Sequence, residues 1–583
     1  MKKYISMIAA SLMAVSCVDT IILPDNMTVE EDFWKTKSDV QLMVSGAYQS
    51  MLSSDIQTRL LVWSGLRSDE MVPVANLTSA LAEDLTEVNL ANIQDDNTFA
   101  SWGAFYKVIN NCNIVLEKAS KVLAEDPSYT QGDYLADCSK MLALRSLCYF
   151  YLVRNFRDVP YVDVAYLSSS QDRNVAQSAP SEVLEHIIAD LQTAETNAVA
   201  SNAYGDWRDV GYLTRDGVQA LLADVYLWRG SVMHNSADYE KCVEYCNKVI
   251  ASKKANHVAD RFRAENPDDE FPSLIAGNET FINLYVDQNA EESIFELQYN
   301  GTNNGNVALC QYYNHYSGTA APYLYASSIY GYAAANGVYT FNNGTESKST
   351  DWRGLMNTYN KTVTVGEFEA FEIRKYVSDN PTYMPTLTTS AAESKNRVYS
   401  TNYQQNFIIY RLADVILMKA EALTALSSGT YEEDTRVAEA FNLVRLVNAR
   451  SLEDQADSMV LKNVAPDAVK METLVLQERQ RELAFEGKRW YDLLRYNYRH
   501  VSGVDYTTTL ADQNERGVSF VVNYQPMLDL MKQKLGSKGE AVAAKMGTEP
   551  RLYMPLPLSD LKISPLLKQN PAYSSNENTS KNY

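Results

Sequence analysis

The sequence is poor in the residues that metal centres use. Only five histidines occur among 583 residues, and they are scattered. Seven cysteines are present; Cys242 and Cys246 lie four residues apart, on one face of a predicted helix, without a second His or Cys pair at matching spacing. We therefore expect no metal site and no cofactor. Cys112, Cys138, Cys148 and Cys310 also fall mostly inside apolar helical patterns, which is typical of small buried residues.

Positive charge and catalytic motifs are also scarce. The formal net charge is −21, which argues against nucleic acid or an anionic membrane surface as a partner. No nucleophile elbow, phosphate loop or zinc-helix motif occurs. The two carboxylates of a glycosidase can come from anywhere in a chain, so a surface glycoside hydrolase stays open as an alternative without positive support.

The N-terminal segment MKKYISMIAASLMAVSC carries a short apolar run behind two lysines. Residues 5–15 are fewer than the roughly 20 apolar residues that a membrane-spanning helix needs, which favours a cleaved secretory signal. The small Ser16 before Cys17 resembles the lipobox of bacterial lipoproteins, although that motif usually has Leu where Ala14 stands. We therefore predict that Cys17 is lipidated, which would anchor the protein in a membrane.

Helical periodicity dominates much of the chain. Apolar residues recur at three- and four-residue spacing around 38–52, 101–124, 134–156, 180–197 and 214–230. Two further segments, 221–252 and 411–450, each have the pattern of a tetratricopeptide-like helix pair. Stacked antiparallel pairs of this kind build one curved scaffold with a continuous core.

The middle of the chain differs from the helical parts. Across residues 255–405 periodicity weakens, Gly, Asn and Tyr become more frequent, and short alternating runs such as SIFELQYN appear. The predicted fold class is mostly α, with a tetratricopeptide-like helical-pair scaffold and a loop-rich, short-strand insertion. The predicted parts are a signal peptide (1–16), a lipidated tether (17–27), an N-terminal helical part (28–254), a ligand-binding insertion (255–405) and a C-terminal helical part (406–583), packed as one composite unit.

The densest charge pattern lies in LVLQERQRELAFEGKRWYDLLRY, residues 474–496. On a continuous helix, Glu478, Glu482, Glu486 and Arg489 share one face, opposite an apolar face that includes Gly487. We interpret the charged row as structural ion pairs rather than catalytic carboxylates. The glycine is expected to permit close approach of another backbone.

A tyrosine-rich segment, residues 299–339, is the best candidate for ligand contact. Its rings are interleaved with amide side chains, and flat rings beside hydrogen-bonding groups suit the apolar faces and hydroxyl rim of a carbohydrate. The alternative is that these tyrosines pack an irregular region. The candidate ligand-binding residues are Tyr312, Tyr313, Asn314, His315, Tyr316, Tyr323, Tyr325 and Tyr330.

In this order along the chain, these motifs resemble the SusD/RagB family of outer-membrane nutrient-binding lipoproteins of Bacteroidetes. The resemblance begins at Cys17 and continues nearly to the C-terminus. Its segments are EEDFWKTKSDVQLMVSGAYQSM (30–51), LRSDE (66–70), SWGAFYKVINNCNIVLEKA (101–119), RSLCYFYLVRNFRDVPYVD (145–163), IIADLQTAE (187–195), DWR (351–353), NFIIYRLADVILMKAEAL (406–423), ERxxELAFEGKRWYDLLR (478–495) and YMPLPLSDLKISPLLKQNPAY (553–573). Arg157 departs from the pattern, because the family usually has Gly there.

The resemblance implies a surface lipoprotein of the outer membrane without catalytic activity. It implies that the protein binds glycans, or in some members peptides or another nutrient, and delivers them to a SusC-like TonB-dependent transporter, over which it sits as a lid. Glycan-binding members draw aromatic rings partly from the region before the Trp of segment 101–119. Residues 71–98 contain none here. Hydrogen bonds from Asn76, Asn89, Asn92 or Asn97 are the expected substitute.

Overall fold

The computed structural model describes residues 33–74, 79–168, 170–256, 274–275, 277–301, 304–313, 321–328, 339–340, 350–365, 367–376, 403–452, 459–522 and 524–573. Residues 1–32 are not among them, so the predicted signal peptide, Cys17 and the tether lie outside the described part. No described helix is long and apolar enough to cross a membrane.

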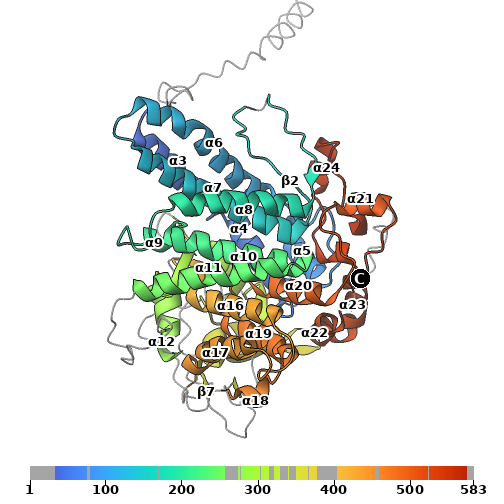
Figure 1. The fold of residues 1–583 in the computed structure, drawn as a ribbon. Helices are drawn as coiled ribbons and strands as arrows, with labels where there is room; N and C mark the ends of the chain where they lie inside the picture. The colour runs from blue at the N-terminus through green and yellow to red at the C-terminus, as the bar shows by residue number, and fades with distance from the viewer. Residues whose placement is uncertain are drawn as a thin grey trace, which may run out of the picture.

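Helices stacked side by side form the scaffold (Figure 1). The N-terminal helices are α3 (Lys37–Ser50), α4 (Ser54–Leu61), α5 (Ala80–Asn89), α6 (Gly103–Glu125), α7 (Gln131–Phe156), α8 (Pro180–Asn197), α9 (Arg208–Gly211), α10 (Arg215–Met233) and α11 (Ser236–Ala255). Threonines at the starts of α3 and α7 form capping boxes with Asp39 and Asp133, which fixes where both helices begin. The predicted pair 221–252 is α10 packed on α11.

The C-terminal helices continue the same stack. They are α16 (Leu412–Leu426), α17 (Thr435–Arg450), α18 (Leu461–Val464), α19 (Ala468–Glu482), α20 (Arg489–His500), α21 (Leu510–Glu515), α22 (Gln525–Leu535), α23 (Gly539–Met546) and α24 (Leu558–Ile563). Helices α16 and α17 form the predicted pair 411–450, and α16 also packs on α11. Buried apolar residues from Trp34 to Tyr573 make one continuous core, and the mostly α, helical-pair fold predicted from the sequence is confirmed.

The middle of the chain contributes short helices and strands. The helices are α12 (Gly277–Phe281), α13 (Val307–Tyr313) and α14 (Trp352–Asn357). An antiparallel sheet has the order β1 (Met71–Pro73), β5 (Leu324–Ala326), β9 (Phe368–Ile373) and β8 (Thr358–Val365). Separate antiparallel pairs are formed by β4 (Ser293–Leu297) with β10 (Phe407–Arg411), β2 (Val159–Pro160) with β3 (Gln177–Ser178), and β6 (Tyr339–Thr340) with β7 (Thr350–Asp351). Because β1 belongs to the N-terminal part, the four-stranded sheet ties the insertion to the scaffold.

The expected continuous helix over 474–496 is wrong. Helix α19 ends at Glu482 and α20 begins at Arg489, with Phe485 (φ 61°) and Gly487 (φ 72°) in the left-handed region between them. A Cβ on Gly487 would lie 3.3 Å from the carbonyl oxygen of Leu60. The predicted close backbone approach at this glycine is therefore confirmed, but in a turn rather than on a helix face.

Arg157 occupies the position where the family usually has Gly. Its φ of 67° and ψ of −73°, with the Asp158 amide donating to the Phe156 carbonyl at 2.9 Å, describe the rare positive-φ γ-turn. The buried guanidinium is bound from two sides: Nε donates to Glu549 and Nη1 donates to Asp158, both at 2.8 Å. The side chain thus holds a turn that glycine would adopt without strain.

The six described cysteines carry free thiols. All except Cys138 are buried, in agreement with their interpretation as small core residues. Burial raises the pKa of Cys112 to about 12, which keeps this thiol protonated and unreactive at neutral pH.

Candidate ligand-binding surface

The structure separates the predicted tyrosines by burial. Tyr312 and Tyr313 lie at the end of α13 and Tyr325 lies in β5; their exposed fractions are 3%, 1% and 3%. Tyr323, directly before β5, is partly exposed. Of the remaining candidates, Asn314, His315, Tyr316 and Tyr330 lie outside the described residues.

Two of the buried tyrosines are packing residues. The Tyr313 hydroxyl donates to the carbonyl of Phe485 at 3.2 Å. Tyr325 joins Val72 and Ala370 in a small apolar cluster on one face of the sheet, while its neighbours Leu324 and Ala326 face the main core. At these two positions the structure agrees with the alternative interpretation, in which the tyrosines pack an irregular region.

Tyr323 and its neighbours form what we call the tyrosine rim, made of Val74, Tyr312 and Tyr323. The β1–β5 pairing continues past both strands, because the Val74 amide donates to the Tyr323 carbonyl at 2.9 Å. The Tyr323 amide donates to the Gln311 carbonyl at 3.1 Å, which fixes the ring beside α13. The Tyr312 and Tyr323 rings meet edge to face, with centroids 5.3 Å apart. The buried ring thus supports the exposed one.

Helix α5 and the segment after it lie next to the rim, since α5 packs on β1. Asn97 is buried. Its side-chain nitrogen donates to Glu87 at 2.9 Å and its side-chain oxygen accepts from the Phe99 amide, so this residue is structural. Asn92 accepts from Lys545 at 3.3 Å, whereas the buried side-chain oxygen of Asn89 has no hydrogen-bond partner. Asn76 lies outside the described residues. Among the three amides in the described residues, the structure therefore shows no exposed, preorganised group that would bind a ligand hydroxyl.

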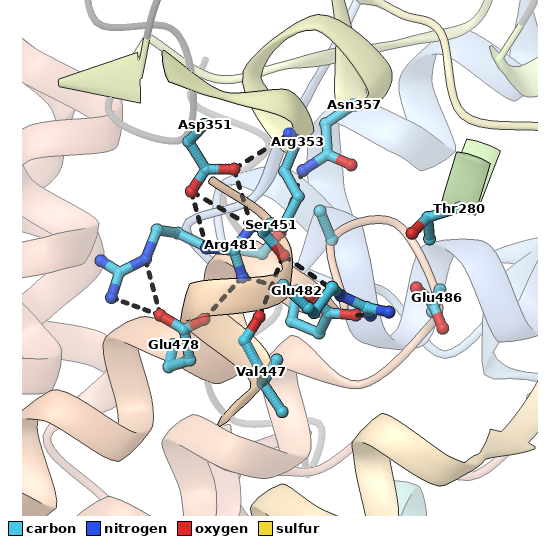
Figure 2. Close-up of polar contacts among 12 residues, drawn as sticks. Thr280, Asp351, Arg353, Asn357, Val447, Ser451, Glu478, Arg481, Glu482 and Glu486 are labelled. Carbon is cyan, nitrogen blue, oxygen red and sulfur yellow. Dashed lines mark hydrogen bonds and ion pairs between the residues drawn. The ribbon is translucent and has the colours of Figure 1, made fainter. Parts of the chain in front are cut away.

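A large group of buried charged side chains lies elsewhere, between the insertion and α19 (Figure 2). We call it the charge seam. Its cations are Arg353, Lys375, Arg411 and Arg450, and its anions are Glu292, Asp351, Glu478, Glu482 and Glu486. All nine residues are buried. They come from β7, α14, β10, α17 and α19, from the residue before β4, and from the segments that follow β9 and α19.

Glu482 is the centre of the charge seam. Its carboxylate lies 3.1 Å from Arg353 and 2.6 Å from Arg411, and it also pairs with Arg450. Burial by itself raises the pKa of Glu482, but Arg450, Arg411 and Arg353 together lower it well below its ordinary value. The carboxylate therefore stays ionised and fully paired.

Glu486 is held in the same way. Arg411 binds it through two nitrogens at 2.8 Å, Lys375 lies 2.7 Å away, and the Tyr285 hydroxyl donates to it at 2.9 Å. Burial raises the pKa of Glu486, and Arg411 and Lys375 outweigh that effect and lower it. A general acid for glycoside hydrolysis needs a raised pKa and access to its substrate. Neither of these carboxylates meets those requirements.

The string after Glu486 is structural too. Lys488 pairs with Asp414 at 2.9 Å, and Arg489 binds Asp69 through Nε and Nη2 at 2.7 and 2.8 Å. The structural role predicted for the charged row is confirmed, but the residues do not form a stripe on one helix. The cationic partners were missed because Lys375, Arg411 and Arg450 come from distant segments whose local sequence carries no signal of the pairing.

No group of three or more His, Cys, Asp or Glu residues in the described part of the chain is arranged to hold a metal ion. The absence of a cofactor stays a prediction.

Comparison with known proteins supplies the family. Residues 291–573 match the model described as "SusD family", and residues 23–227 match the model described as "Starch-binding associating with outer membrane". SusD-like proteins P2 and P38 of Formosa agariphila are 27% and 26% identical over 511 and 499 residues. These alignments cover 85% and 83% of this chain and 91% and 88% of the two relatives.

The fold comparison agrees. The crystal structure of a SusD superfamily protein from Bacteroides thetaiotaomicron superposes with a TM-score of 0.63 at 18% identity, covering 92% of this chain and 100% of that one. A second one, from Parabacteroides distasonis, gives a TM-score of 0.61 at 20% identity, with 92% and 99% covered. At these identities the likeness establishes the fold alone.

Proposed function

We propose that this protein, a member of the SusD/RagB family, captures an oligosaccharide at the tyrosine rim and delivers it to a SusC-type TonB-dependent transporter. The family consists of glycan-binding proteins associated with the outer membrane. It acts by binding and not by catalysis. The ligand-binding part is the insertion, residues 255–405, presented by the helical parts 28–254 and 406–583.

The observation that carries this proposal is the position of Tyr323. Its ring is partly exposed, supported from behind by the buried Tyr312 at a centroid distance of 5.3 Å, and fixed by backbone hydrogen bonds to Val74 and Gln311. A sugar needs a flat ring that is held in place before binding, because ordering a side chain on binding reduces affinity.

Calorimetry with a panel of neutral oligosaccharides tests the proposal. We expect heat of binding for at least one glycan and no release of shorter products during incubation. Binding of peptides with no heat from any glycan would favour the second candidate, a protein of the same architecture that takes peptides or another nutrient. Product release without added enzyme would establish the third, a surface glycoside hydrolase. The buried, ion-paired carboxylates Glu482 and Glu486 argue against that outcome.

We also propose that the protein is anchored at the cell surface by lipid on Cys17, with residues 18–27 as the slack that lets it open over the transporter. Its expected consequence is that Cys17→Ala abolishes lipid labelling and surface retention while glycan affinity stays unchanged. Retention of the cysteine-free protein at the outer membrane would contradict the anchor, and co-purification of the transporter with the wild-type protein tests the partner.

A further inference from the structure

A pocket of about 470 Å³ opens between the start of α6, the segment after β2 and the helix α24. We call it the Trp102 pocket. Its lining includes Trp102, Tyr106, Lys107, Tyr166, Arg173 and Ser564. The tyrosine rim contributes none of the lining residues. The volume falls in the lower part of the range of about 300–1,000 Å³ that small-ligand sites occupy, which suits a single small ring.

The walls of this pocket are fixed by hydrogen bonds that join three distant segments. Trp102 donates its indole N–H to Asp560 at 2.5 Å, and Tyr106 donates its hydroxyl to the Pro160 carbonyl at 2.7 Å. Asn110 clamps the backbone of Tyr166, donating to its carbonyl at 3.0 Å and accepting from its amide at 2.7 Å. Because these polar groups are already used, the aromatic side chains offer the pocket mainly their apolar surface.

Two cations stand at this pocket without an acidic partner. Lys107 makes no ion pair or hydrogen bond within the described residues, and Arg173 makes only one long hydrogen bond, 3.4 Å to the Ser168 carbonyl. The guanidinium lies over the Tyr166 ring, 5.5 Å from its centroid. The one carboxylate in the lining, Asp560, is bound to Trp102. The chain has a net charge of −21, so two unpaired cations at an aromatic pocket give this place a charge opposite to that of the whole chain.

The pocket also holds an unused hydroxyl. The Ser564 oxygen is buried and has no hydrogen-bond partner among the described residues. A ligand that satisfies all of these features has an apolar ring face, a hydroxyl and a negative charge. A pyranose with a carboxylate has this combination, whereas a neutral sugar leaves both cations unused.

We propose that the Trp102 pocket is a binding subsite for an acidic sugar residue, a uronate, whose carboxylate is bound by Lys107 and Arg173 and whose ring packs on Tyr106 and Tyr166. This rests on the proposed glycan-binding function and narrows its substrate class to chains that contain acidic sugars. It differs from the tyrosine rim in selecting by charge.

The test compares D-glucuronate with D-glucose, which share the ring and differ in the carboxylate, by titration of the full-length protein monitored by saturation-transfer NMR. Exposed ion pairs contribute little each, so two of them are expected to make glucuronate bind about fivefold more tightly than glucose. The double variant Lys107→Met and Arg173→Met is expected to lose this preference. Both side chains are exposed, so the variant is expected to fold. Lys121→Met, an exposed lysine further along α6 and outside the pocket, is the matched control and keeps the preference.

Equal affinity of the wild-type protein for both sugars, or no detectable binding of glucuronate, would overturn the inference. So would a preference that survives the double variant. Acetate that binds as tightly as glucuronate would mean an anion site with no role for the ring. The proposed function is judged separately, because neutral oligosaccharides that bind at the tyrosine rim do so in the double variant as in the wild type.

Discussion

The charge seam and the tyrosine rim are two places where the central insertion meets the helical scaffold, and they differ in how much of their chemistry is left unused. In the seam every carboxylate named above is buried against cations, with Glu482 paired to three arginines. In the rim Tyr323 keeps part of its ring exposed. The charge seam therefore holds the insertion to the scaffold, whereas the tyrosine rim, with fewer polar groups, keeps surface that a ligand can contact.

The largest expected effect comes from breaking the seam at its centre. Glu482→Gln keeps the shape of the side chain but removes the charge that Arg353, Arg411 and Arg450 share. Each arginine keeps another carboxylate, but three buried ion pairs lose their shared anion at once. This loss is expected to lower the free energy of unfolding by about 3–5 kcal/mol, measured by chemical denaturation. The control Glu515→Gln, at a mostly exposed glutamate, is expected to change it by less than about 0.5 kcal/mol. Equal stability of the two variants would mean that the ion pairs of the charge seam do not stabilise the fold.

The next effect is a pH dependence at the junction of β1 with the scaffold. Burial raises the pKa of Glu70 to about 8 from 4.5, and burial lowers the pKa of Lys534 to about 7 from 10.5. Lys534 donates to the carbonyls of Leu66 and Ser68, at 2.6 and 2.7 Å, just before this strand. Both groups are buried, so each affects folding stability.

The sign follows from proton uptake. Between pH 4.5 and 8 the folded Glu70 holds a proton that the unfolded chain releases, so its contribution to stability is lost as pH rises through this window. Between pH 7 and 10.5 the unfolded Lys534 holds a proton that the folded chain lacks, so its contribution grows. Glu70→Gln is expected to flatten the fall in the free energy of unfolding between pH 5 and 7. Lys534→Met is expected to flatten the rise in the same free energy between pH 8 and 10. Denaturation curves recorded at each pH measure both. Unchanged slopes would contradict the burial of these charges.

Substitutions of Arg157 are expected to have a smaller effect on stability, and they separate the loss of its ion pairs from the strain of its positive φ. Arg157→Ala loses the pairs to Glu549 and Asp158 and keeps the positive φ, whereas Arg157→Gly loses the same pairs and relieves the backbone. The glycine variant is therefore expected to unfold with a free energy about 1–2 kcal/mol above that of the alanine variant, although both are less stable than the wild type. Equal stabilities would show that the γ-turn stores no strain.

How far the sequence predicted these regions depends on the range of the interactions involved. Helix pairs such as α10 with α11 follow from local periodicity and were predicted with nearly the right limits. The break at Phe485 and Gly487 was missed, because a helical pattern continues through it while Glu486 is bound by Arg411 from a distant strand. Burial of Tyr313 was missed for the same reason, since its partner Phe485 is far away in the sequence. Residue type alone does not show whether charged residues form buried ion pairs or a binding surface. It also does not show whether a tyrosine ring is buried or exposed.

The smallest expected effect separates the two kinds of tyrosine directly. Tyr323→Ala removes a ring that is partly exposed, so it is expected to weaken binding of the best neutral glycan by about 1 kcal/mol, which is about fivefold in the dissociation constant, with little loss of stability. Tyr313→Phe removes only a buried hydroxyl that donates to the Phe485 carbonyl, so it is expected to cost about 1 kcal/mol of stability and leave glycan affinity unchanged. Calorimetry and denaturation of both variants give four values with opposite expectations. If Tyr313→Phe weakens binding while Tyr323→Ala does not, the tyrosine rim is not the ligand-binding surface.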